Sequence, residues 1–299
     1  MRIVMSGASG MIGTALSEQL ASQGHDVVRL VRRPARNAAE WAWNPAAGEL
    51  DEKVFQGVDA VVNLSGTGIG DRPWTKKRIQ VLRDSRLQPT RTLTEAMGRL
   101  SEPPSVFISQ SASGYYGATT DGPLREDSGP GGGVLGPLCV EWERTARTAP
   151  PGVRVVTPRT GVVLSLSGGA LGPLLPLLKL GLGGPFGNGR QYWPWITLAD
   201  EAAALAYLLT ADIDGPVNVC APESADVNTI VSHLAKAFHR PAFCRVPRPA
   251  LRLVLGKLAD ELVLANQRMD AGRLADAGFM WQHPSLPQAM EWLTSAKDH

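Results

Sequence analysis

The glycine-rich turn near the start of the chain constrains the fold more than any other feature of the sequence. A short apolar run, residues 2–6, leads into a turn that holds Gly7, Gly10 and Gly13, and helix-forming residues follow as far as Ser22. In strand-turn-helix units of this kind, the first glycine allows the tight turn, the second lets a diphosphate approach the backbone, and the third lets helix and strand pack closely. The helix N-terminus adds free N–H groups and the positive end of its dipole. The spacing is G-x-x-G-x-x-G rather than G-x-G-x-x-G, but its position after the first strand predicts a dinucleotide-binding turn.

The first half of the chain alternates short β-branched runs with helical patterns. The predicted strands are residues 2–6, 26–31, 60–64, 105–109 and 153–157, with a further short one around 41–43, and the predicted helices are 11–22, 76–100 and 138–148. This alternation is typical of βαβ units, whose right-handed crossovers place helices on both faces of a parallel sheet. We therefore predict an α/β fold built on a doubly wound parallel sheet.

The composition changes after Gly161. Residues 168–189 contain eight glycines and three prolines, which does not suit continued α/β alternation. Thr197 then begins a helical run and residues 215–220 form one more predicted strand, so we expect the segment 197–220 to return to the sheet. From Pro222 onward the pattern is mostly helical, with Asp226 as a predicted N-cap. We predict a dinucleotide-binding domain at 1–161 and a smaller, mainly helical domain at 162–299.

Charge and composition exclude several classes of protein. The 30 basic and 28 acidic residues give a net charge of +2, so no broad field attracts nucleic acid. The three cysteines are widely spaced and form no C-x-x-C pair, which argues against a disulfide framework and a metal site. The N-terminus lacks a signal peptide, and no stretch of about 18 apolar residues is present. We expect a cytoplasmic protein that binds a small-molecule substrate and neither nucleic acid nor membrane; its oligomeric state stays open.

Two arginines follow the second predicted strand. Sites that select NAD usually present an acidic residue at this place, where it accepts a hydrogen bond from the ribose 2′-hydroxyl. Here the charge is reversed, because Arg32 and Arg33 stand there. Two guanidiniums can hold the 2′-phosphate of NADP, which an aspartate would repel. The position favours NADP(H) as cofactor over NAD(H), the alternative being a solvated pair of surface arginines.

Seven longer motifs, spread over nearly the whole chain, are more specific than the glycine pattern. They are SGASGMIG, VVNLSG, RPWTKKRIQVLRDSR, VFISQSASGYYG, RTGVVLSLSGGAL, GLGGPFGNGRQYWPWI and RPAFCRVPRPALRLVLG. In these motifs the chain resembles the extended short-chain dehydrogenase/reductase superfamily, and more closely its atypical branch of epimerase-family proteins with a DUF1731-type C-terminal domain. The resemblance implies a Rossmann domain for the cofactor and a smaller C-terminal domain for the substrate.

The resemblance also implies a set of cofactor contacts. The pyrophosphate contacts expected from it come from the glycine turn, namely Gly7, Ser9, Gly10, Met11, Ile12 and Gly13. It places Leu50 and Asp51 near the adenine, Val162 at the nicotinamide end, and the residues after the fourth strand, Leu64, Ser65, Gly66 and Thr67, beside the ribose and nicotinamide. Arg72 is expected either to reach the cofactor phosphates from the next loop or to pack that loop.

Active members of this superfamily use a Tyr-x-x-x-Lys pair, in which the lysine lowers the pKa of the tyrosine. That pair is missing here. If Glu143 is matched to the acid that follows the pair, the tyrosine falls at Leu135 and the lysine at Cys139. The usual Ser/Thr partner falls at Ala112. Candidates for proton transfer are instead the hydroxyls after the 105–109 strand, with Tyr116 preferred and Ser111 and Ser113 beside it; a tyrosine that only packs is the alternative.

Substrate binding is predicted near Tyr115 and in the loop 181–196, where Arg190 and Trp193 suit a pocket with aromatic walls and one anion-binding group. The other interpretation of this loop is a hydrophobic plug between the two domains. We predict an NADP(H)-dependent oxidoreductase or epimerase-like enzyme that acts on a small polar carbonyl or hydroxyl compound, with nucleotide sugars among the candidates. The alternative is an NADP(H)-binding regulatory protein without catalysis, which the missing Tyr-x-x-x-Lys pair supports.

Overall fold

A computed structural model describes residues 1–172, 174–180, 183–242 and 244–295. Its centre is an eight-stranded sheet in the order β12-β8-β5-β4-β1-β2-β3, with β6 paired to β8. Every pairing within this sheet is parallel. The strands are β1 (Arg2–Ser6), β2 (Asp26–Val31), β3 (Glu40–Ala42), β4 (Ala60–Asn63), β5 (Val106–Ser109), β6 (Ser111–Ala112), β8 (Arg154–Thr160) and β12 (Gly215–Val219). The predicted doubly wound parallel sheet is confirmed.

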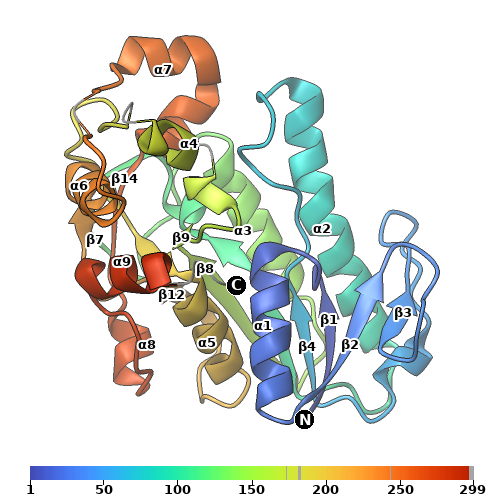
Figure 1. The fold of residues 1–299 in the computed structure, drawn as a ribbon. Coiled ribbons are helices and arrows are strands. Elements are labelled where there is room, and N and C mark those ends of the chain that lie inside the picture. Colours follow the sequence, from blue (N-terminus) through green and yellow to red (C-terminus); the bar gives the residue numbers. More distant parts are fainter. Residues whose placement is uncertain (173, 181–182, 243, 296–299) are drawn as a thin grey trace.

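Helices cover both faces of this sheet (Figure 1). The pair α1 (Met11–Ser22) and α5 (Leu198–Leu208) packs together on one face, and α2 (Lys76–Gly98) packs with α3 (Leu135–Ala146) on the other. The central strands are buried on both sides; β4 and β5, for example, contain only buried residues. Strands of this kind read as continuous apolar runs because neither face meets water. Their carboxyl ends form one edge, where α/β sheets bind ligands.

The largest differences from the predicted bounds, three residues each, are at the start of α3 and the end of β8, and a proline lies near each of these ends. Helix α3 begins at Leu135, three residues before the predicted start at residue 138, because Pro137 lies in the first turn, where a helix needs no N–H donor. Strand β8 continues to Thr160 instead of ending at residue 157. Pro158 lies beyond Val156, the last residue of β8 that pairs with β5, so its missing N–H breaks no bond to that strand.

The C-terminal half forms a smaller lobe, mainly helical, beside the carboxyl end of the sheet (Figure 1). Its helices are α4 (Leu174–Lys179), α6 (Val227–Ala237), α7 (Arg248–Leu255), the π-helical turn η4 (Ala259–Val263), α8 (Gly272–Asp276) and α9 (Leu286–Ser295). Short strand pairs lie outside the main sheet: β9 (Val162–Leu164) with β11 (Trp195–Thr197), β10 (Tyr192–Trp193) with β13 (Ala225–Asp226), and β14 (Asn266–Met269) with β7 (Thr119–Leu124). The pairing of β14 with β7 joins the C-terminal half to a segment of the first domain.

Helices α5 and α6 each begin at a residue whose side chain caps the helix. Thr197 accepts a hydrogen bond from the N–H of Asp200 at the start of α5, and Asp226 accepts one from Thr229 at the start of α6, as predicted from these residue types. After α5, β12 joins the main sheet beside β8. Short 3₁₀-helical turns are formed by η1 (Glu52–Phe55), η2 (Ser113–Tyr116) and η3 (Gly169–Leu171). Within the described ranges, no helix is long and apolar enough to cross a bilayer.

Candidate functional site

The glycine turn joins β1 to α1 with almost no free space around two of its glycines. Gly7 has a φ of 73°, and a Cβ on it would lie 2.5 Å from the carbonyl carbon of Leu64, the residue after β4. A Cβ on Gly13 would lie 2.3 Å from the carbonyl oxygen of Gly7. Such distances are far inside van der Waals contact. Gly7 and Gly13 therefore allow strand, helix and the neighbouring strand end to approach closely.

Gly10 has a different environment. It is exposed and forms the N-cap of α1 without any side-chain hydrogen bond, and the first turn of α1 holds no acidic residue. The first N–H groups of a helix, here those of Met11 and Ile12, have no helical acceptor. Together with the positive end of the helix dipole, they form a site that suits an anion. The geometry of this turn fits a diphosphate held by backbone N–H groups, with exposed Ser9 beside them.

The two arginines after β2 have different partners. Arg33 donates two hydrogen bonds of 2.7 Å to the carboxylate of Glu40, the first residue of β3. The hydrogen bond from Arg33 lowers the pKa of Glu40 to about 2, so this carboxylate is charged at neutral pH. Arg32 is exposed and makes no hydrogen bond or ion pair with the residues that the structure describes. The structure thus leaves the guanidinium of Arg32 available to a ligand while Glu40 holds that of Arg33.

Hydrogen bonds to side chains hold the segment after β4 in place. Ser65 donates to the hydroxyl of Ser6 at 2.9 Å, and Ser6 donates to the side-chain oxygen of Asn63 at 2.7 Å. The N–H of Thr67 donates to Ser85 on α2 at 3.1 Å. These bonds fix the 64–67 segment at the carboxyl ends of β1 and β4, next to Gly7. The predicted ribose side of the cofactor cleft is therefore a short, well-anchored loop.

The other predicted cofactor residues lie on several different segments. Leu50 is buried, and Asp51 caps η1 by accepting from the N–H of Lys53. Arg72 is exposed on the loop before α2. The N–H of Val162 donates to the carbonyl of Pro194. The loop before η3 comes back to the glycine turn, because a Cβ on Gly169 would meet Met11. The structure brings the glycine turn, Leu64 and η3 together.

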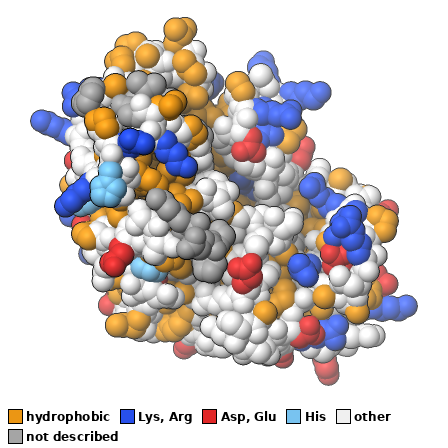
Figure 2. Space-filling model, in the orientation of Figure 1, with side chains coloured by type: hydrophobic (Ala, Val, Ile, Leu, Met, Phe, Trp, Pro, Cys, Tyr) orange, Lys and Arg blue, Asp and Glu red, His pale blue; other side chains and the backbone are white. Residues whose placement is uncertain are grey.

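Basic side chains gather on two parts of the surface near these elements. Figure 2 shows Lys and Arg grouped over the start of α2 and around β2 and β3, with mostly uncharged surface between them. The exposed residues concerned are Arg29, Arg32 and Arg36 near β2 and β3, and Arg72, Lys76 and Lys77 near the start of α2. A chain with a net charge of only +2 thus concentrates positive charge where a polyanionic ligand would approach.

A buried polar cluster lies beyond the cleft, between β8 and α3. Arg159 of β8 donates to both carboxylate oxygens of Glu143 of α3, at 2.8 and 3.0 Å, and the two side chains are each 2% exposed. Burial alone would lower the pKa of Arg159, but the hydrogen bonds and charge of Glu143 outweigh burial and raise it. Ser111 donates to Glu143 at 2.8 Å. Sequence reasoning missed this pair, since single polar residues in apolar runs give no sign of their partners.

Two of the predicted proton donors, Tyr116 and Ser111, belong to this cluster. The hydroxyl of Tyr116 donates to Asn218 at 2.6 Å and accepts from Arg159 at 3.0 Å, and the residue is 1% exposed. Burial raises the pKa of Tyr116 to about 12. Ser111 is equally buried, Ser113 offers its carbonyl to Gln267, and the half-buried ring of Tyr115 stacks on Arg159. These contacts support a packing role for Tyr116 and leave its catalytic role a prediction.

The positions where the superfamily has its tyrosine and lysine are also buried. Leu135 and Cys139 both lie on the inner face of α3. Burial raises the pKa of the Cys139 thiol to about 12, so it carries no charge at neutral pH. Beside them, a Cβ on Gly114 would lie 3.0 Å from Leu135. The space of the usual catalytic pair is filled with apolar packing.

A buried carboxyl at the ends of β5 and β8 was also missed. Glu201 of α5 is fully buried, accepts from the hydroxyl of Thr160 at 2.8 Å and lies 3.5 Å from the amide nitrogen of Gln110. Its second carboxylate oxygen has no partner within the described part of the chain. Burial raises the pKa of Glu201 to about 7. The Glu201 carboxyl therefore keeps its proton to a higher pH than an exposed glutamate does.

The residues predicted for the substrate do not form one cluster with Tyr115. Trp193 is buried in the core of the C-terminal lobe, stacks against Phe186 with ring centroids 6.1 Å apart, and donates to the carbonyl of Val263. Arg190 is exposed, and its N–H donates to the side chain of Asn188. Trp193 thus packs the lobe that carries the loop, which agrees with the alternative interpretation of a hydrophobic plug. The substrate role of Arg190 stays a prediction.

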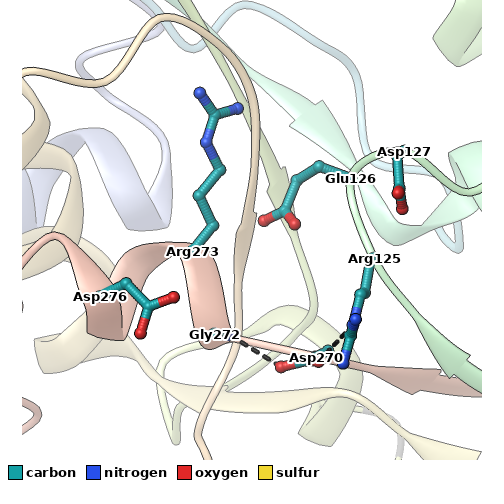
Figure 3. Close-up of a pocket in the computed structure, with 7 residues that line it drawn as sticks. All are labelled: Arg125, Glu126, Asp127, Asp270, Gly272, Arg273 and Asp276. Carbon is teal, nitrogen blue, oxygen red and sulfur yellow. Dashed lines mark hydrogen bonds and ion pairs between the residues drawn. The ribbon is translucent and has the colours of Figure 1, made fainter.

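A separate hollow of about 450 Å³ lies beside β12. Figure 3 shows its lining of charged side chains and one glycine, which comprises Arg125, Glu126, Asp127, Asp270, Gly272, Arg273 and Asp276. Its two guanidiniums already have partners: Arg125 donates to Asp270 at 3.0 Å, and Arg273 donates to backbone carbonyls. The hollow carries more carboxylates than arginines, so it does not suit a dinucleotide phosphate. No group of three metal-ligating side chains occurs among the described residues.

The fold and the glycine turn define a nicotinamide-dinucleotide-binding protein of the short-chain dehydrogenase/reductase type. The family model described as NAD dependent epimerase/dehydratase family matches residues 3–133, and a domain of unknown function, DUF1731, matches residues 246–293. An epimerase family protein of Mycobacterium bovis is 40% identical over 295 residues, covering 98% of this chain and 97% of the relative. The chain belongs to this epimerase family, in the branch with a C-terminal DUF1731 domain.

Solved structures agree with this assignment. The crystal structure of human epimerase family protein SDR39U1 with NADPH matches with a TM-score of 0.91 at 31% identity, covering 99% of this chain and 100% of that one. A UDP-glucuronic acid 4-epimerase from Bacillus cereus matches with a TM-score of 0.78 at 19% identity, a likeness that shows the fold alone.

Proposed function

We propose that this protein is an NADP(H)-dependent oxidoreductase or epimerase-like enzyme that acts on a small polar carbonyl or hydroxyl compound. The observation that carries the proposal is the uncapped start of α1 behind the exposed Gly10, because it offers N–H donors and a positive dipole end to a diphosphate. When bound, the cofactor would supply hydride chemistry at the nicotinamide. The chain itself binds and orients it: the glycine turn would hold the diphosphate, and the 64–67 loop the ribose.

The preference for a 2′-phosphate rests on Arg32. Its guanidinium is exposed and unpaired within the described chain, whereas that of Arg33 is held by Glu40. We propose that Arg32 makes the main contact with the 2′-phosphate and that the Arg33–Glu40 pair stabilises the loop around it. The related human protein, whose structure contains NADPH, supports this choice.

Affinity measurements on variants test the cofactor assignment. Arg32→Ala should weaken NADPH binding at least tenfold, as expected for losing a charge-assisted contact of about 1.5 to 3 kcal/mol, while NADH binding changes little. Arg36→Ala is the matched control, because Arg36 is exposed on the same loop. Equal affinity of the unaltered protein for NADPH and NADH would contradict the assignment.

A second candidate function is an NADP(H)-binding regulatory protein without catalysis. Specific observations favour it: Leu135 and Cys139 are buried where the superfamily has its tyrosine and lysine, and the Tyr116 hydroxyl is already bonded to Asn218 and Arg159. A panel of carbonyl compounds, nucleotide sugars included, tested with NADPH separates the two. Turnover of any compound above background rejects the regulatory function.

A further inference from the structure

One buried cation has no acidic partner, and it lies directly under the predicted ribose and nicotinamide loop. Arg86, in the middle of α2, is 7% exposed. Its Nη2 donates to the carbonyl of Thr67 at 3.2 Å, and its Nη1 donates to the carbonyl of Leu82 at 3.0 Å. The guanidinium also faces the ring of Trp142, at 5.3 Å from the centroid. All of these partners are neutral.

The guanidinium touches the loop backbone itself. A Cβ on Gly66 would lie 3.3 Å from the Cζ of Arg86, so the missing side chain at Gly66 lets the cation reach the backbone. No carboxylate of the described residues is within ion-pair distance of Arg86; the other charged group that acts on it is a second arginine, Arg78. Among the described residues, the acidic side chain within ion-pair distance of Arg78 is Asp71. Its carboxylate is largely exposed and lies 3.8 Å from the guanidinium of Arg78. Within the described part of the chain, the charge of Arg86 behind the loop is thus not balanced by a carboxylate in contact with it.

A buried charge without a counter-charge is costly. Burial lowers the pKa of Arg86, yet a guanidinium stays protonated in proteins. The fixed charge therefore acts on any ligand that rests on the other side of Gly66 and Thr67. On the function proposed above, that ligand is the nicotinamide half of the cofactor, whose two oxidation states differ by one charge: the oxidised ring is positive and the reduced ring is neutral.

We infer that Arg86 makes this site bind the reduced dinucleotide more tightly than the oxidised one, and so makes the bound oxidised form a stronger hydride acceptor. The inference rests on the proposed function and deepens it. Tighter binding of the reduced form lowers the free energy of the product of hydride acceptance, so the charge of Arg86 favours that step. In the favoured direction, the alcohol carbon of the substrate gives a hydride to the oxidised dinucleotide and its oxygen gives a proton to water, so the alcohol becomes a carbonyl and the dinucleotide is reduced. Arg86 is a positioning residue in this scheme, since it acts through the loop.

Coulomb's law gives the expected size of the difference in affinity between the reduced and the oxidised cofactor. At an effective dielectric constant of about 20, a unit charge that acts on the nicotinamide ring across the loop would change the relative affinity for the two oxidation states on the order of tenfold. We therefore expect the unaltered protein to bind NADPH about ten times more tightly than NADP⁺. This ratio is a binding quantity and needs no known substrate.

Titrations of both oxidation states into three variants test the inference. Arg86→Met should bring the ratio of NADP⁺ to NADPH dissociation constants down about tenfold, and Arg86→Lys, which keeps the charge, should retain most of it. Arg83→Met is the matched control, because Arg83 lies on the same helix but is half-exposed and paired with Glu141. A residue that only held the loop would weaken both forms equally and leave the ratio unchanged.

Each outcome of these titrations either supports or overturns the inference. A ratio near one in the unaltered protein overturns the inference while the proposed function stands, and this holds even if Arg86→Met fails to fold. A ratio that survives in a folded Arg86→Met protein also overturns it. Binding of neither NADPH nor NADP⁺ overturns the proposed function and the inference together.

Discussion

Removing the charge of Glu201 should change how the stability of the protein depends on pH. Burial raises the pKa of this carboxyl from 4.5 to about 7 in the folded protein, and its contacts with Thr160 and Gln110 do not offset the burial. Between these two values the unfolded chain releases the Glu201 proton while the folded protein keeps it. The free energy of unfolding therefore falls as pH rises through this window. The difference corresponds to about 3 kcal/mol, fully lost above about pH 7.

The assay is urea denaturation of the unaltered protein and of Glu201→Gln at steps from pH 4.5 to 8.5. Glutamine has nearly the same shape and does not titrate, so the other carboxylates contribute equally to both proteins. We expect the variant to gain up to about 3 kcal/mol over the unaltered protein as pH rises. Parallel pH profiles would show that Glu201 ionises at its ordinary pKa and would refute the reasoning.

Three further substitutions test the cleft and the buried cluster. Gly13→Ala places a Cβ 2.3 Å from the carbonyl oxygen of Gly7; we expect a loss of about 1 to 3 kcal/mol in thermal unfolding and weaker NADPH binding, and a fully stable variant would contradict the packing argument. Glu143→Gln leaves Arg159 buried without a counter-charge, so denaturant unfolding should show a loss of about 3 to 5 kcal/mol, and a loss below 1 kcal/mol would argue against the ion pair. Tyr116→Phe should cost about 1 kcal/mol with the rate of NADPH consumption on an accepted substrate unchanged; a hundredfold slower rate would return Tyr116 to the mechanism.

The glycine turn could be predicted because its signal is local. Strand, turn and helix follow one another within residues 2–22, and the three glycines fall where the backbone must pass close to itself. The same holds for the caps at Thr197 and Asp226, since the capping side chain bonds to an N–H three residues later. Starts of helices with an internal proline were harder, as α3 shows, because Pro137 fits the first turn as well as it breaks a later one.

The buried polar clusters could not be predicted because their members are far apart in the sequence. Ser111, Tyr116, Glu143, Arg159 and Asn218 come from five separate segments and meet only when the sheet forms. The pattern of a single chain cannot show which buried polar residue faces which. The structure therefore shows what the motifs could not: which side chains form hydrogen bonds with the hydroxyls of Tyr116 and Ser111.

The same limit applies to the arginines after β2. From the sequence alone, Arg32 and Arg33 are equally good candidates for the contact with the 2′-phosphate, because both directly follow β2. The structure separates them, since Arg33 and not Arg32 donates to the carboxylate of Glu40, seven residues after Arg33.

Calorimetric titration of the purified protein with NADPH, and separately with NADH, tests the central claim most directly. If backbone N–H groups at the start of α1 hold the diphosphate and Arg32 holds the 2′-phosphate, NADPH should bind saturably at one site per chain and more tightly than NADH. Absence of a binding signal with both nucleotides would contradict the account.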